Sequence, residues 1–272
     1  GGTRLGSANV VDFLLVDQYA VFETEEQRVL ALGELITNTF SAFTAGGLPG
    51  PRGLAATIGP VVEEGRLGVW WRDGGTAAEL IELTGLDASF PRPDGGDLIG
   101  VVHQNAGQNK IDVYLERTLD YRVVVDDGDA RATAVVTLTN RAPTDGLPDA
   151  VIGSNDQGFP PGTNVARVHL HTALDLVSLE VDGVETPADR RSAFGAEAIG
   201  TVVEIPSGAT VVLRYELRGR LDGVPYSLTV AQQALVGVET VTAIATIDGE
   251  IVDLLSAHPL TTDITVTPDV DE

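Results

Sequence analysis

The sequence predicts an α+β protein in which a helix-rich first third is followed by a β-rich remainder. Apolar residues recur at helical spacing up to about residue 95, whereas from Leu98 onward they alternate with a period of two. Between these regions, residues 86–97 contain two prolines and a pair of glycines, which is typical of a loop or linker. We therefore expect two modules, one of residues 1–97 and one of residues 98–272.

The bulk composition restricts the classes of function. Hydrophobic residues make up 43 % of the 272 residues, which is enough for a sizeable core. The 17 basic and 40 acidic side chains give a net charge of −23, so the surface should repel phosphate backbones and we expect no nucleic-acid partner. The chain has no cysteine, which excludes disulfides and thiolate chemistry. It contains no run of 18 apolar residues, so we expect no membrane span in this chain.

The first helices are predicted from their N-terminal signals. Ser7 is an expected N-cap for a short helix. The stretch from Thr24 to Gln27 fits a capping box that opens a long helix over about residues 25–44, and a pair of glycines should end it. Pro51 should open the next helix, which Pro60 should kink or split.

The rest of the first module is predicted as a strand and a helix. Residues 67–71 form an apolar run that we expect to be a short buried strand, in which Trp70 and Trp71 are core residues rather than a platform for sugar rings. A second capping box begins at Thr76 and should open a helix that stops near Gly85.

The second module is predicted to be an antiparallel β-sandwich of immunoglobulin-like type, because many short strands follow one another between turn signals. The turn signals are paired Asp-Gly or Ser-Gly residues, as at Asp127-Gly128 and Asp248-Gly249. The expected strands are residues 98–103, 111–125, 131–139, 165–171, 174–182, 200–205, 210–218, 225–231, 239–247 and 262–267.

Several segments together resemble the DUF-4012 family (DUF4012), a domain of unknown function found in actinobacterial envelope proteins. The clearest is residues 107–117 (GQNKIDVYLER), which hold the only lysine of the chain, with Ile111 and Val113 where the family carries Met and Tyr. The other matching segments are residues 3–5, 9–15, 25–27, 64–67 and 160–164. The resemblance implies an extracytoplasmic protein of the cell surface or cell wall. It also implies that residues 1–97 are a helical α/β remnant that completes an upstream or partner domain.

The upstream part of that family is similar in outline to the LytR-CpsA-Psr glycopolymer transferases. In those enzymes an Arg-Gln cluster faces a polyprenyl pyrophosphate, and the nearest equivalent here is Arg28 beside Gln27. The resemblance therefore offers Arg28 as a ligand for an anionic lipid head group. The alternative is a solvated arginine that forms ion pairs with Glu25 and Glu26 on the helix surface.

Two further regions carry candidate ligand-binding residues. Lys110 is either a counter-charge for Asp112 or Glu116, which would lock the two modules together, or an anion ligand. The loop of residues 153–164 includes Asn155, Asp156 and Asn164, whose amide and carboxylate groups suit sugar binding. The same residues also suit a turn-rich loop that serves no ligand.

Metal and catalytic motifs are weak. His169 and His171 should point to one face of a strand, but a third ligand is not nearby in sequence, so we expect an ordinary strand. Residues 126–129 are rich in aspartate but lack the full calcium-loop pattern, so a hairpin turn is preferred. We predict no metal site, no cofactor and no self-sufficient catalytic constellation.

The leading hypothesis is a structural or interaction protein of the cell envelope that is associated with cell-wall glycopolymers. Its expected partner is the upstream half of the same precursor or another envelope protein, with cell-wall glycan as a further partner. One alternative is a part of a polyprenyl-phosphate glycopolymer transferase. Another is a carbohydrate-binding module that uses the loop of residues 153–164.

Overall fold

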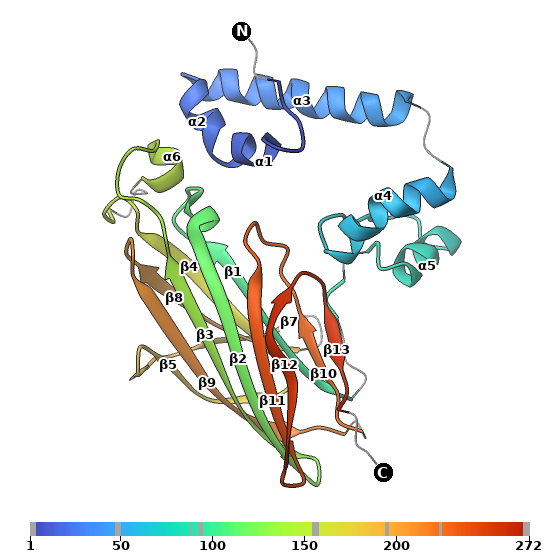
Figure 1. The fold of residues 1–272 in the computed structure, drawn as a ribbon, viewed down its shortest axis with the longest axis vertical. Coiled ribbons are helices and arrows are strands. Elements are labelled where there is room, and N and C mark those ends of the chain that lie inside the picture. The colour runs from blue at the N-terminus through green and yellow to red at the C-terminus, as the bar shows by residue number, and fades with distance from the viewer. Residues whose placement is uncertain are drawn as a thin grey trace.

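The α+β fold class is confirmed by the computed structural model, in which helices lie beside one end of two β-sheets (Figure 1). The structure describes residues 4–46, 50–87, 89–91, 95–153, 158–193, 196–222 and 225–268. None of the described helices has the length and apolar character needed to cross a membrane.

The longest helix, α3 (Glu25–Ala45), begins at the predicted capping box. The Thr24 hydroxyl accepts a hydrogen bond from the Gln27 amide at 3.3 Å, and the Gln27 side chain accepts one from the Glu23 amide at 3.2 Å. The first bond satisfies an amide that the first turn of a helix leaves without a partner, and the second holds the residue before the N-cap against that turn. No residue of α3 is buried, and only Arg28, Ala31, Leu32 and Leu35 are partly covered.

The remaining N-terminal helices are shorter. A bent helical segment is made of α1 (Val10–Asp12), the π-helical turn η1 (Phe13–Asp17) and α2 (Gln18–Val21). Helix α4 (Pro51–Glu63) begins at the predicted proline, and α5 (Thr76–Leu83) follows it.

Helix α4 continues through Pro60, so the alternative in which the proline splits the helix is wrong. The preceding Gly59 has no Cβ to clash with the proline ring, and only three residues of helix follow Pro60. Helix α5 starts at Thr76 itself with Gly75 as its N-cap, and no side chain caps it, so the second capping box does not form.

The predicted buried strand at residues 67–71 is also wrong. These residues form no strand, and the backbone is fixed by a hydrogen bond from Val69 N to Leu86 O at 2.6 Å. Trp70 is 79 % exposed and Trp71 is 51 % exposed. An apolar run becomes a buried strand only where a sheet offers it a free edge, and this segment joins no sheet in the described part of the chain.

The second module consists of two sheets. The first has the strand order β13-β10-β1-β4-β8-β7, and the second has the order β12-β11-β2-β3-β9-β5-β6. The strands of the first sheet are β1 (Asp97–Asn105), β4 (Asn164–Thr172), β7 (Asp189–Ala193), β8 (Ala196–Ile205), β10 (Leu228–Ala231) and β13 (Ile264–Val266). Those of the second are β2 (Leu115–Asp126), β3 (Asp129–Asn140), β5 (Asp175–Val181), β6 (Val184–Glu185), β9 (Thr210–Arg220), β11 (Glu239–Ile247) and β12 (Glu250–Leu260).

The sheets are mixed rather than purely antiparallel. Most neighbouring strands pair antiparallel, as in the β2–β3 hairpin, but β1 pairs parallel with β10 and β2 pairs parallel with β11. The expectation of an antiparallel sandwich is therefore wrong for these two pairs, and the immunoglobulin-like topology is not confirmed. Strand β12 was not expected from the sequence. It is irregular, with a shifted register opposite Ala243 and a positive φ of 44° at Ala257.

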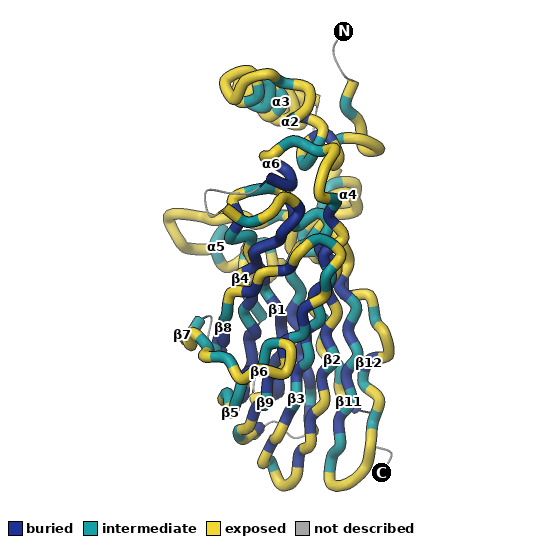
Figure 2. The backbone as a smooth tube through the Cα atoms, turned by 90° about the vertical axis from the view of Figure 1, so that its left-hand side faces the viewer, coloured by how far each residue is buried: buried dark blue, intermediate teal, exposed yellow. Residues whose placement is uncertain are grey.

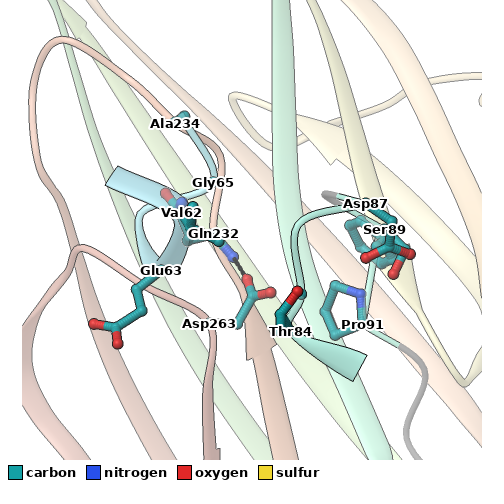
Figure 3. Close-up of a pocket in the computed structure, with 12 residues that line it drawn as sticks. Val62, Glu63, Gly65, Thr84, Asp87, Ser89, Pro91, Gln232, Ala234 and Asp263 are labelled. Atoms are coloured by element: carbon teal, nitrogen blue, oxygen red, sulfur yellow. Dashed lines mark hydrogen bonds between the residues drawn. The ribbon is translucent and has the colours of Figure 1, made fainter. Parts of the chain in front are cut away.

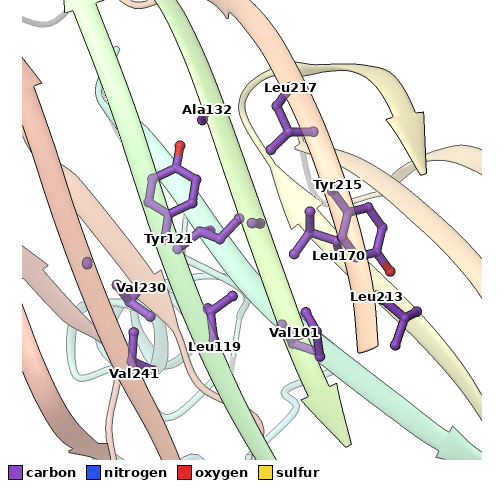
Figure 4. Packing of buried hydrophobic residues seen from close by; sticks show 14 of the residues in the cluster. Val101, Leu119, Tyr121, Ala132, Leu170, Leu213, Tyr215, Leu217, Val230 and Val241 are labelled. Atoms are coloured by element: carbon purple, nitrogen blue, oxygen red, sulfur yellow. The ribbon is translucent and has the colours of Figure 1, made fainter. Parts of the chain in front are cut away.

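One hydrophobic core lies between the two sheets. Buried residues alternate with exposed or partly exposed ones along β2 and β3, and Figure 2 shows this alternation along the strands of the sandwich. Figure 4 shows Leu119 and Tyr121 of β2 in the same cluster as Val101 and Leu170 of the other sheet. Because both sheets contribute to one cluster, they form a two-layer sandwich.

The tight turns of the sandwich follow the sequence prediction. Asp127-Gly128, Asp182-Gly183 and Asp248-Gly249 all have positive φ at both residues, which is what hairpin turns of this length require. Asp126 and Asp129 face each other as the last pair of the β2–β3 hairpin, which confirms the turn interpretation of this acidic stretch.

Candidate functional site

The motif around Lys110 forms a cluster of amides with one carboxylate. Asp112 lies in the 3₁₀ turn η2 (Ile111–Tyr114), where the sequence had predicted the start of a strand. Its Oδ1 accepts hydrogen bonds from Asn164 Nδ2 at 2.9 Å and from Asn105 Nδ2 at 3.2 Å. Asn109 Oδ1 accepts a second bond from Asn105 at 2.9 Å, and Asn109 Nδ2 donates to Gly153 O at 3.1 Å. These amides connect β1, η2, β4 and the loop after α6 (Asp149–Ile152).

Burial dominates the electrostatics of this cluster. It raises the pKa of Asp112 above its ordinary value, although the bonds from Asn164 and Asn105 and the charge of Lys110 act in the opposite direction. Asn164 is fully buried, and within the described residues its Oδ1 has no hydrogen-bond partner. Asn164 therefore holds Asp112 inside the fold instead of presenting its amide to a ligand from solvent.

The charge of Lys110 acts on the pKa of Asp112, but among the described residues Lys110 forms no direct ion pair with either of its two predicted partners. Its side chain is exposed, and Glu116 pairs instead with Arg141 at 2.9 Å. At this motif the contact between the modules is apolar. Ile111 is completely buried in a second cluster with Val151, and Tyr19 of the helical segment packs against that cluster. A buried aliphatic side chain provides this connection without the desolvation that a charged pair would require.

Arg28 of α3 is occupied by contacts with Tyr19 of α2 and with Glu25 of its own helix. Its guanidinium carbon lies 4.6 Å from the centre of the Tyr19 ring, and its Nη2 lies 3.6 Å from Glu25 Oε1. This arrangement agrees with the surface ion pair and not with a group aimed into a lipid groove. Asn155 and Asp156, the other two candidate ligand residues, lie outside the described residues.

A buried polar network that was not predicted from the sequence connects the two sheets. Arg117 of β2 binds Glu239 of β11 through two hydrogen bonds of 2.9 and 2.7 Å. Its remaining Nη1 lies 2.9 Å from both His103 Nδ1, on β1 of the other sheet, and Gln233 Oε1. Burial and the Arg117 charge lower the pKa of His103 to about 3, so the ring is neutral at ordinary pH and its Nδ1 accepts the bond. Burial raises the pKa of Glu239, which the contact with Arg117 opposes.

The carboxylate of Asp97 is the centre of a second buried polar group, which joins the start of β1 to the middle of β2. Asp97, at the start of β1, is fully buried and accepts hydrogen bonds from Tyr121 OH at 2.7 Å and Tyr226 OH at 2.9 Å. Its other oxygen accepts a bond from the Leu98 amide at 2.8 Å. Burial raises the pKa of Asp97 to about 6 despite these bonds. All of these partners belong to the fold, so we interpret Asp97 as a structural tie between the sheets.

A cavity of about 620 Å³ lies between the α4–α5 region and the edge of the first sheet. Its described lining includes the carboxylates of Glu63, Asp87 and Asp263 and no basic side chain. The Gln232 amide donates to Asp263 at 2.7 Å, and the Gln232 side chain donates to Glu64 O at 2.5 Å, so this residue connects the helix end to the sheet edge. In Figure 3 the Asp263 carboxylate lies beside Gln232, while the Glu63 side chain points away from it. Among these lining residues there is no nucleophile paired with a base.

The two histidines on β4 have separate surroundings. His171 packs against the Phe90 ring at a centroid distance of 4.8 Å, and His169 lies over Gly200, where an added Cβ would stand 2.5 Å from the imidazole. Burial lowers the pKa of both. Over the part of the chain that the structure describes, no three His, Asp or Glu side chains are placed to hold a metal ion.

Comparison with known proteins assigns neither a family nor a function to this chain. The sequence matches no protein-family model and no curated protein. Among solved structures, a Legionella pneumophila protein provisionally named a nutrient-binding protein aligns with a TM-score of 0.39 at 10 % identity, covering 63 % of this chain and 70 % of that one. Leukotriene A4 hydrolase from Saccharomyces cerevisiae aligns with a TM-score of 0.32 at 12 % identity, covering 57 % of this chain and 28 % of the hydrolase. Similarities at these scores carry no argument about fold or function.

Proposed function

We propose that this chain is an extracytoplasmic structural or interaction protein of the cell envelope, associated with cell-wall glycopolymers. Residues 4–91 would be the part through which it binds a polypeptide partner. The observation that carries the proposal is the exposure of large hydrophobic side chains in this region. Most of the strongly exposed ones lie there, although it is only a third of the chain, and they include Ile36, Phe40 and Leu83. A monomeric surface rarely leaves so many apolar side chains in water unless a partner covers them.

The envelope location rests on the resemblance of residues 107–117 and the other matching segments. The partner is the upstream half of the same precursor or another envelope protein. A role as part of a glycopolymer transferase is not favoured, because it needs Arg28 to face an apolar groove. Arg28 instead lies over Tyr19 and beside Glu25.

The proposal predicts that the protein isolated from its own cell envelope carries a polypeptide partner held by apolar contacts. Native mass spectrometry of the gently purified envelope fraction should show the 28.5 kDa chain together with a second polypeptide. The double variant Leu80→Asp/Leu83→Asp on α5 should lose that partner, because two carboxylates would have to be buried in the interface.

The matched control is Ile251→Asp on β12, since Ile251 is also exposed but lies on the sandwich. It should keep the partner. Recovery of the wild type in the cytoplasmic fraction, or as a single chain without any partner, would contradict the proposal.

A second candidate function, carbohydrate binding, is favoured by one specific observation. Trp70 and Trp71 are adjacent, and both are exposed. Exposed indole rings stack on the apolar faces of sugars, whereas the amide of Asn164, in the loop expected to bind sugar, is buried. If the protein binds cell-wall glycan directly, these two side chains are the better contact.

Tryptophan fluorescence tests this function directly, because Trp70 and Trp71 are the only tryptophans of the chain. Titration with solubilised cell-wall glycan should shift the emission to shorter wavelength as the exposed indoles leave water. The Trp70→Ala variant should bind roughly tenfold or more weakly, which is the usual effect of removing an aromatic contact. An unchanged spectrum at saturating glycan would exclude these residues as the binding platform.

A further inference from the structure

Four of the five strongly exposed large apolar side chains of α3, all except Leu30, lie in one stripe along the helix. Val29, Ile36, Phe40 and Phe43 are spaced by seven, four and three residues, which places them on the same face of a helix. Their exposed fractions are 58 %, 69 %, 67 % and 51 %. Figure 1 shows α3 at the outer end of the molecule, with its C-terminal half extending beyond α1 and α2. The stripe is therefore open to a partner along its length.

The charged side chains of α3 all lie in its first half, and this restricts where a second copy can bind. The whole chain carries a net charge of −23, so two copies repel each other over most of their surfaces. The charged side chains of α3 are Glu25, Glu26, Arg28 and Glu34, all in its first half. Residues 35–46 have none, so two copies can meet there without bringing carboxylates together.

The polar side chains beside the stripe are already satisfied within the helix. The hydroxyls of Thr37, Thr39 and Thr44 donate to the carbonyls of Gly33, Leu35 and Phe40 at 2.8, 2.8 and 2.9 Å. A hydroxyl that donates to its own helix loses less when water is removed than one that depends on water. This face can consequently be covered by another apolar face without leaving unpaired donors.

We propose that α3 pairs with α3 of a second copy in an antiparallel, two-fold symmetric contact centred on Phe40. This inference rests on the proposed function, because it names the polypeptide that covers part of the helical region. In such a pair Phe40 meets the same residue of the second copy, and Ile36 lies against Phe43 of that copy. Glu34 then lies opposite the end of the other helix, outside the uncharged contact.

Single-cysteine cross-linking tests this geometry cleanly, because the chain has no cysteine of its own. Packed helix axes lie about 8–10 Å apart and Cα atoms about 2.3 Å from each axis, so Cα atoms on the two-fold axis are within reach of a disulfide. Under mild oxidation the purified Phe40→Cys variant should form a covalent dimer. Asn38→Cys is the matched control, because Asn38 is also exposed on α3 but points to the opposite side.

Light scattering on the purified wild-type protein should give twice the mass of 28.5 kDa at micromolar concentration. Phe40→Asp should weaken the dimer by at least ~100-fold, because a central aromatic contact is replaced by a buried carboxylate. The pairing is wrong if the wild-type protein stays monomeric. It is also wrong if the Asn38→Cys variant forms the covalent dimer as readily as the Phe40→Cys variant.

The pairing and the proposed function can fail separately. If the purified protein is monomeric but the envelope preparation contains a different polypeptide held through residues 4–91, the pairing is wrong and the proposed function stands. If neither a second copy nor another polypeptide binds, both are wrong.

Discussion

Replacing Glu239 with alanine is expected to lower the free energy of unfolding by about 3–5 kcal/mol. The side chains of Arg117 and Glu239 are only 1 % and 3 % exposed, so removal of the carboxylate leaves a guanidinium buried without its counter-charge. His103 and Gln233 do not compensate, because neither carries a negative charge. Chemical denaturation monitored by circular dichroism measures the change.

The double variant Arg117→Met/Glu239→Leu should recover most of that loss, since two apolar side chains of similar size remove both buried charges. The control is Glu116→Ala on β2, next to Arg117 in the sequence. Its partner Arg141 is 61 % exposed and Glu116 is 62 % exposed, so this variant should change stability by less than about 1 kcal/mol. If Glu239→Ala and Glu116→Ala lower the free energy of unfolding by the same amount, burial does not determine how much the Arg117–Glu239 pair contributes to stability.

Asp97 is expected to make the protein less stable as the pH rises from about 4 to about 7. Folding raises the pKa of this carboxyl from its ordinary value of 3.8 to about 6, so between these values the folded state binds more protons than the unfolded state. The associated stabilisation is fully present below the lower value and is lost as the pH rises through the higher one. A shift of this size corresponds to roughly 3 kcal/mol.

The Asp97→Asn variant isolates this contribution. The difference in unfolding free energy, wild type minus variant, should fall by roughly 2 kcal/mol between pH 4 and pH 7, which is most of the full effect. His103 has the opposite effect, because its lowered pKa removes stability as the pH falls from 6.5 toward about 3. Both proteins keep His103, so its titration cancels in the difference. If this difference does not change with pH, folding does not change the pKa of Asp97.

The elements that the sequence predicted well are those set by local rules. The α3 cap at Thr24 and the Asp-Gly turns depend on a few neighbouring residues, and both formed as predicted. The strand at residues 67–71 depended on a distant partner and did not form. The parallel neighbour of β2 is likewise a strand more than a hundred residues away, which no local pattern specifies.

At the candidate site, too, the sequence did not reveal contacts between residues that are far apart in the chain. One of the two interpretations of Lys110 was that its charge locks the modules together, whereas the residue of this motif that packs between them is the buried Ile111. A signal for the buried ion pair was present, because the alternation along β2 places Arg117 on the same face as Leu119 and Tyr121. Its partner Glu239 could not be predicted, since 122 positions separate the two residues.

That separation also determines when the sandwich can be completed. The β2–β3 hairpin closes through a two-residue turn and needs no later part of the chain. The other edge of β2 stays unpaired until β11 has been synthesised, because Thr118 pairs with Thr240. Non-local pairings of this kind slow folding, and an open strand edge invites association with other chains. A chaperone that shields this edge during biosynthesis should therefore raise the yield of folded protein more than one that acts on the finished chain.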